Sequence, residues 1–90
     1  MTAPRDRPTE FTRAIRAELK HRIADQGLTR KQIAQATGHT AATIHRWLDS
    51  ERPLRVTSVE EICAAIGVEP RQVIADAEVR MPPPAAQPVK

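Results

Sequence analysis

The chain has 90 residues, of which 40% are hydrophobic, and a formal net charge of +3 at pH 7. This length allows one domain with one small core, and the single cysteine excludes an internal disulfide and a cysteine-rich zinc site. No apolar run is long enough to span a bilayer, and the N-terminus has no signal-peptide core. We therefore expect a cytoplasmic protein with no membrane partner.

The basic charge is concentrated in the first part of the chain. Residues 1–55 hold eleven Lys or Arg and six Asp or Glu, whereas residues 56–90 hold three and five. Such a basic half is expected of a protein that binds nucleic-acid phosphates, although ordinary solvated surface has the same composition. One Trp and one Phe are too few for the stacking platforms of a single-strand binder.

The N-terminal part predicts a flexible segment followed by one amphipathic helix. Residues 1–8 hold two prolines around Arg5 and Arg7 and are predicted to form a flexible basic arm. A first helix is predicted over about 9–26, because apolar residues recur at every fourth position, and Gly27 ends it. The apolar stripe consists of Phe11, Ile15, Leu19 and Ile23.

Two short helices joined by a tight turn are predicted next. Thr29 and Gln32 have the spacing of a capping box at the start of the first, and Thr40 can cap the second. Gly38 can end the first in the left-handed conformation, which glycine adopts without a Cβ clash. The predicted helices are 29–37 and 40–49.

The second of these short helices has two different faces. Ile44, Trp47 and Leu48 share an apolar face that we expect to be buried. The opposite face is small at its N-terminal end and polar further on, so it can enter a DNA groove. That face consists of Ala41, Ala42, His45 and Arg46.

The remainder predicts two more helices and a tail. A fourth helix is predicted over about 57–66, with a capping box at Thr57 and Glu60 or at Ser58 and Glu61. Pro70 suits the first turn of a fifth helix, because its missing N–H would have no partner there. The fifth helix is predicted over 70–79, and the proline-rich residues 80–90 as a disordered tail. The buried face of the fourth helix consists of Val59, Ile62, Cys63 and Ile66.

These segments together resemble the helix-turn-helix domains of phage repressors, Cro proteins and xenobiotic-response-element-type regulators. The resemblance covers about residues 10–77 and includes the run 56–70, which is similar to the fourth helix of that family. It implies an all-α, five-helix lambda-repressor-like bundle with the helix-turn-helix at helices 2 and 3, and a DNA-binding domain over 9–79. The matching positions are Leu28, Thr29, Ile33, Ala34, Gly38, Thr40, Thr43, Ile44 and Trp47.

The resemblance also implies roles for individual residues on double-stranded DNA. In this family the third helix lies in the major groove with its N-terminal residues at the base edges. Arg46 can then donate two parallel hydrogen bonds to a guanine. The implied base-reading residues are Thr40, Ala41, Ala42, His45 and Arg46. The implied phosphate-binding residues are Thr29, Arg30, Lys31, Thr43, Arg52 and Arg55, with Arg5 and Arg7 as arm contacts.

The expected function is therefore a Cro-like or repressor-like transcription regulator of phage or prophage type that binds operator DNA as a homodimer. Two alternatives remain open: an excisionase-like architectural DNA-binding factor, and an antitoxin-type protein-interaction module. No arrangement of residues typical of an enzyme is present, and we expect no cofactor, metal or small-molecule ligand. The dimer-interface candidates on the fifth helix are Val73, Ile74 and Val79.

Overall fold

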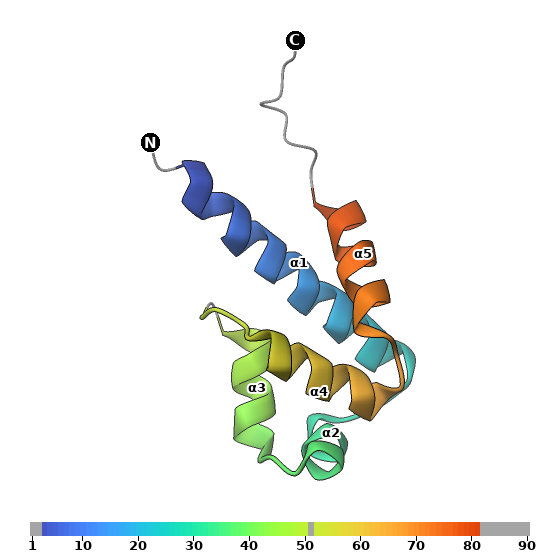
Figure 1. The fold of residues 1–90 in the computed structure, drawn as a ribbon. Coiled ribbons are helices and arrows are strands. Elements are labelled where there is room, and N and C mark those ends of the chain that lie inside the picture. The colour runs from blue at the N-terminus through green and yellow to red at the C-terminus, as the bar shows by residue number, and fades with distance from the viewer. Residues whose placement is uncertain (1–2, 51, 82–90) are drawn as a thin grey trace.

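The computed structural model describes residues 3–50 and 52–81, with side chains described from residue 10 onward. These residues form five helices and no strand, which confirms the predicted all-α architecture (Figure 1). The helices are α1 (Ala3–Asp25), α2 (Arg30–Thr37), α3 (Ala41–Asp49), α4 (Val56–Ile66) and α5 (Pro70–Arg80).

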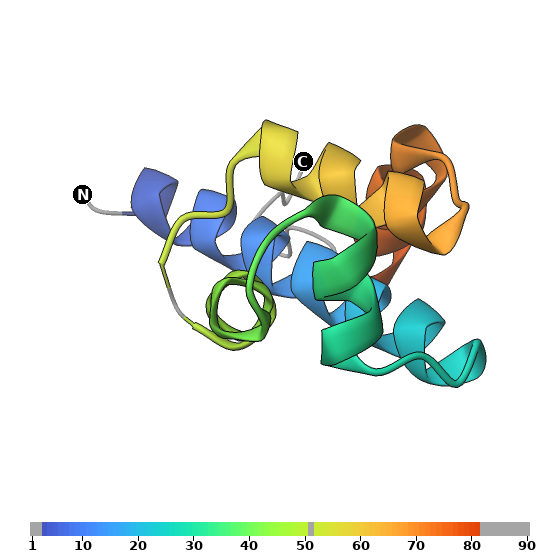
Figure 2. The ribbon, with the colours of Figure 1, turned by 90° about the horizontal axis from the view of Figure 1, so that it is seen from below.

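The long helix α1 is the element against which most of the others pack. It contacts α3, α4 and α5, and α2 packs between α3 and α4. Figures 1 and 2 both show the first turns of α1 extending past the other helices. The helix-turn-helix of α2 and α3 therefore lies at one end of the bundle, and the pair α1–α5 at the other.

The core draws apolar side chains from all five helices. Leu19 of α1, Ile44 of α3 and Ile62 of α4 are completely buried at its centre. Each such side chain contributes about 1.5–3 kcal/mol to stability when it leaves water. The stripes predicted from the sequence supply most of this core, but Phe11 is only half-buried and lies outside it. The core cluster comprises Leu19, Ile23, Ile33, Ala34, Ile44, Leu48, Val59, Ile62, Cys63, Ile66 and Val73.

The prediction of a flexible arm over residues 1–8 is wrong for residues 3–8, because α1 begins at Ala3. The two prolines do not prevent this, since the proline φ near −65° is helical and Pro4 lies in the first turn, where N–H groups lack partners. Pro8 costs the helix one backbone hydrogen bond. The backbone of Arg5 and Arg7 is thus helical, and their side chains lie outside the described residues.

The start of α4 also differs from the prediction. The N-cap residue is Arg55, with no side-chain hydrogen bond to the helix, so neither predicted capping box forms. Because α4 begins at Val56, Thr57 and Ser58 lie inside its first turn, and Ser58 is turned into the interior. The first N–H groups of α4 are therefore left without a side-chain cap.

The last helix corrects one dimer-interface prediction. α5 begins at Pro70 as predicted and ends at Arg80, so the predicted tail loses its first residue, and residues 82–90 lie outside the described part. Val73 is completely buried against the core and is not available to a second subunit. Ile74 is half-buried, and Val79 is 83% exposed.

A network of charged side chains joins α1 to α5. Glu18, which is buried, accepts hydrogen bonds from Arg22 Nε at 2.9 Å and from Arg80 Nε at 2.6 Å. Arg22 also pairs with Asp76. The hydrogen bond from Arg80 is the largest cause that lowers the pKa of Glu18, and it outweighs the opposing effect of burial. Each of the two carboxylates therefore has at least one arginine partner.

Candidate nucleic-acid interface

Local hydrogen bonds fix the helix-turn-helix as the sequence predicts. The capping box at α2 is complete: Thr29 Oγ1 accepts from Gln32 N at 3.1 Å, and Thr29 N donates to Gln32 Oε1 at 2.8 Å. Gly38 ends α2 with φ of 81°, in the left-handed region. Thr40 Oγ1 accepts from Thr43 N at 3.1 Å and caps α3. These contacts set the angle at which α3 leaves the turn.

α3 buries one face and presents the other to solvent. Ile44 and Leu48 are completely buried, and Trp47 packs at the edge of the core against the ring of His39, with ring centroids 4.8 Å apart. On the other side Ala42, His45 and Arg46 are exposed. Thr40 is exposed and Ala41 half-buried. The structure thus places Ala42, His45 and Arg46 on the exposed side of α3, with Thr40 exposed at its N-cap.

Arg46 is only loosely held on this face. Its Nη2 is 3.4 Å from Thr43 Oγ1, a long hydrogen bond between two exposed side chains. It leaves the other N–H donors of the planar guanidinium able to meet a ligand. Arg46 therefore has the freedom that bidentate recognition of a guanine requires.

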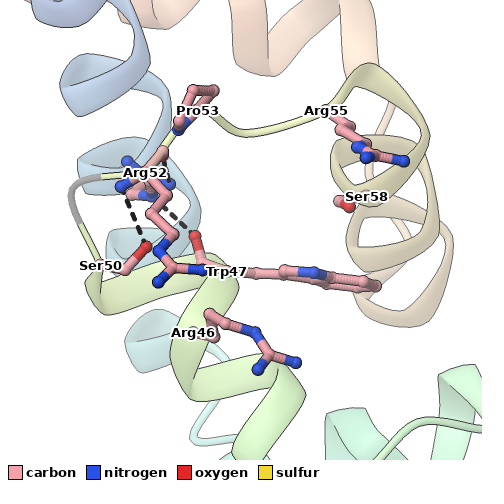
Figure 3. A pocket seen from close by; sticks show the side chains of 8 residues that line it. Arg46, Trp47, Ser50, Arg52, Pro53, Arg55 and Ser58 are labelled. Atoms are coloured by element: carbon pink, nitrogen blue, oxygen red, sulfur yellow. Dashed lines mark hydrogen bonds between the residues drawn. The ribbon is translucent and has the colours of Figure 1, made fainter.

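A basic hollow of about 360 Å³ opens between the end of α3 and the start of α4 (Figure 3). Figure 3 shows Arg46 and Trp47 on the α3 side of this hollow and Arg55 and Ser58 on the α4 side. No acidic residue lines it among the residues that the structure describes. We call it the α3–α4 hollow; its lining is Arg16, Arg46, Trp47, Ser50, Arg52, Pro53, Arg55 and Ser58.

The start of α4 adds uncompensated positive charge to the hollow. The first helical bond there runs from Val59 N to Arg55 O at 3.1 Å, so the N–H groups of residues 56–58 have no partner within the helix. Ser58, which lines the hollow at this end of α4, is 94% buried. The positive end of the helix dipole lies at the same place. This arrangement suits an anion.

Arg16 is a structural residue of the hollow that the sequence did not reveal. It is buried, its Nε donates to Trp47 O at 2.7 Å, and its Nη2 donates to Arg52 O. It therefore ties α1 to the last turn of α3 and to the loop that follows. The carbonyl of Trp47 belongs to the last turn of α3, where carbonyls lack helical partners and a cation is favourable.

Arg30, at the start of α2, is paired with the far end of α3. Its Nη1 and Nη2 donate to the two carboxylate oxygens of Asp49 at 3.1 and 3.4 Å. His45 Nδ1 lies 3.3 Å from the same carboxylate. Burial acts to raise the pKa of Asp49, but hydrogen bonds from Arg30 and His45 outweigh it, so this pKa lies below its ordinary value. Asp49 is thus ionised at neutral pH.

Comparison with known proteins decides the family. A profile of the Cro/C1-type helix-turn-helix DNA-binding domain matches residues 18–77, two thirds of the chain. The chain belongs to the Cro/C1-type helix-turn-helix family. Among solved structures, the clp gene regulator ClgR from C. glutamicum has a similar fold, with a TM-score of 0.72 and 20% identity, covering 81% of this chain and 95% of that chain. A search of the curated proteins finds no match.

In this Cro/C1-type domain the predicted phosphate-binding residues form two groups. Arg52 and Arg55 meet Arg46 at the α3–α4 hollow. Arg30 and Lys31 lie at the start of α2, where Lys31 is exposed and makes no ion pair with the described residues. Thr29 and Thr43 take part in the caps of α2 and α3. Sequence reasoning missed Asp49, whose partners lie on three different helices.

Two further observations concern other kinds of site. The described residues contain no group of three or more His, Cys, Asp or Glu side chains placed to hold a metal ion. His39 instead pairs with Glu61, 2.6 Å from Nε2 to Oε1, and so joins the helix-turn-helix to α4. Burial raises the pKa of the Cys63 thiol, as expected of a small core residue. None of the helices in the described part of the chain is long and apolar enough to cross a membrane.

Proposed function

We propose that the protein is a sequence-specific transcription regulator that binds double-stranded operator DNA as a homodimer, with α3 in the major groove. The observation that carries this proposal is the outward face of α3, where Ala42 leaves room for close approach and Arg46 supplies free donors. The family match supports DNA binding. The similar fold of a solved gene regulator, ClgR, supports a regulatory role.

Base recognition is assigned to the residues of the outward face. Arg46 donates two parallel hydrogen bonds to O6 and N7 of a guanine, worth about 1–3 kcal/mol of discrimination. The methyl groups of Ala41 and Ala42 contact thymine methyls or allow the backbone to approach the bases. Thr40 and His45 contact neighbouring base edges. Few side chains thus determine the sequence preference, and Arg46 contributes the largest share.

The phosphates on either side of the groove are held by the two basic groups. On one side Arg30 donates to a phosphate, together with Lys31 and the N-terminal N–H groups of α2. On the other side the α3–α4 hollow accepts a phosphate through Arg52, Arg55 and the uncapped start of α4. Secondary contacts are assigned to Thr29, Thr43 and, from the first turns of α1, Arg5 and Arg7.

A homodimer is proposed because one small domain reads few base pairs. Of the candidates on α5, Ile74 and Val79 remain, since both expose apolar surface. Two α3 helices then enter successive major grooves on a near-palindromic operator, about 34–36 Å apart. We infer a cytoplasmic regulator of the phage or prophage Cro/repressor type, acting on nucleoid DNA.

The proposal is tested by selecting bound duplexes from a random pool at two salt concentrations. We expect an enriched palindrome and affinity that falls steeply with salt, because cations on the protein replace the counterions of several phosphates. Salt-dependent binding without an enriched sequence would favour an architectural DNA-binding factor. Absence of binding at both salt concentrations would contradict the proposal and favour a protein-interaction module.

A further inference from the structure

Asp49 is an acidic residue in the middle of the proposed DNA-binding surface. It is the last residue of α3, where the negative end of the helix dipole disfavours a carboxylate. Basic side chains from three helices compensate for this position. Asp49 accepts hydrogen bonds from Arg30, lies 3.3 Å from His45 Nδ1, and is 3.5 Å from the Nζ of Lys20.

The surroundings of Asp49 are otherwise strongly basic. A second hollow, of about 190 Å³, lies between α1 and the end of α3 and is lined by Arg13, Arg16, Lys20 and Asp49 among others. Together with the α3–α4 hollow it brings six basic residues to this side of the molecule, and Asp49 is the one acidic residue among the described lining residues. A carboxylate at this place weakens the field that attracts the phosphates of any DNA sequence.

The pairing also restrains Arg30 without using all its donors. A guanidinium has five N–H donors in a fixed fork, and the contacts to Asp49 engage two of them. The Arg30 side chain is 25% exposed, so it is held in one orientation while still open to a phosphate.

We propose that Asp49 is a specificity-determining residue that lowers the affinity of the protein for non-operator DNA more than its affinity for the operator. Non-operator binding depends on basic side chains that move to the nearest phosphates, and Asp49 both repels those phosphates and restrains Arg30 and His45. In the operator complex the repulsion is offset, because Arg30 is already oriented toward the phosphate that it meets when α3 docks. This inference rests on the proposed function.

The test compares Asp49→Asn with Asp25→Asn for binding to an operator duplex and to a scrambled duplex over a series of salt concentrations. Asp25 is a matched control, because it is the last residue of α1 and forms no ion pair with the described residues. We expect Asp49→Asn to raise affinity for the scrambled duplex by about fivefold and to change operator affinity by less than about twofold. The ratio of the two affinities should therefore fall, whereas Asp25→Asn should leave it unchanged.

Two further variants make the test sharper. Arg30→Ala combined with Asp49→Asn should show a smaller gain on the scrambled duplex than Asp49→Asn alone, because one of the released cations is missing. Asp49→Ser is measured beside Asp49→Asn, so that the conclusion does not depend on the folding of one variant. Circular dichroism in urea checks that each variant is folded.

The outcomes separate the inference from the proposed function. If Asp49→Asn weakens both duplexes equally, or matches Asp25→Asn on both, the residue has only a structural role and the inference is overturned. If the wild-type protein itself binds neither duplex, the proposed function fails and the inference falls with it. If the wild-type protein prefers the operator and Asp49→Asn reduces that preference through the scrambled duplex, both stand.

Discussion

Charged side chains are used differently at the two ends of the bundle. At the α1–α5 side, the carboxylates of Glu18 and Asp76 form ion pairs with the arginines Arg22 and Arg80. At the α3–α4 side, four arginines line one hollow with no described acidic residue. The first arrangement holds helices together, and the second leaves positive charge for a ligand.

The contrast shows that the number of arginines alone does not locate a binding surface. Arg22 and Arg80 have acidic partners at the α1–α5 side, whereas Arg46 makes a long hydrogen bond to the hydroxyl of Thr43. Arg16 is an intermediate case, since it lines the hollow but donates to two backbone carbonyls. The contacts of each arginine therefore determine whether its replacement should affect stability or DNA binding.

The largest effect is expected from Arg16→Ala. It removes two charge-assisted hydrogen bonds and leaves the carbonyls of Trp47 and Arg52 without their donor, which should cost about 3 kcal/mol of unfolding free energy. Urea denaturation followed by circular dichroism measures this, with the exposed Arg71→Ala as the control. A loss no greater than that of the control would contradict this structural role of Arg16.

Arg46→Ala should leave stability unchanged and alter recognition. We expect a loss of about 2 kcal/mol of discrimination at one base pair, because a bidentate contact to guanine is removed. Arg30→Ala should instead weaken binding to the operator and to all its single-base variants about equally and reduce the salt dependence by about one unit. Binding titrations with single-base operator variants distinguish the two, and identical behaviour of the two mutants would contradict their separate roles.

Glu18→Gln should destabilise the α1–α5 side by about 1–2 kcal/mol at neutral pH, because hydrogen bonds from Arg80 and Arg22 to a charged acceptor are weakened. The pKa of Glu18 is lowered in the folded protein, so its contribution is full above its ordinary value of 4.5 and is lost as the pH falls through the lowered folded-state pKa. The stability difference between wild type and variant should therefore shrink in acid. With Glu78→Gln as control, a difference that does not change with pH would refute this role.

The smallest effect on the folded monomer is expected from Val79→Glu. The side chain is 83% exposed, so the unfolding free energy should change by less than about 0.5 kcal/mol. A charge at this position should nevertheless weaken a dimer that buries it. Sedimentation equilibrium of wild type and variant with operator DNA measures this, and unchanged assembly would exclude Val79 from the interface.

The sequence predicted those features that depend on neighbouring residues. The caps at Thr29 and Thr40 and the left-handed Gly38 are local choices, and the structure confirms all three. The predictions of a flexible N-terminal arm and of a capping box at α4 are wrong, and the reasons are local as well. α1 tolerates its prolines, and a buried Ser58 lies within the first turn of α4.

Contacts between distant residues lay beyond sequence reasoning. The partners of Arg16 are 31 and 36 residues away, and Glu18 and Arg80 are 62 apart. Their pairing depends on how α1 crosses the other helices. The same holds for Arg30 and Asp49, 19 residues apart. The sequence could thus propose Arg30 as a phosphate contact, but it could not show that a carboxylate holds it.

The division between the two sides is tested most directly by amide chemical shifts of ¹⁵N-labelled protein titrated with a duplex that carries one selected half-site. A half-site binds one protomer, so changes from dimer formation do not interfere. We expect the largest shifts in α3, at Arg30, and in residues 56–58 at the start of α4, with little change at Glu18, Arg22 and Asp76. Shifts concentrated in α1 and α5, with α3 unchanged, would contradict the proposed DNA-binding surface.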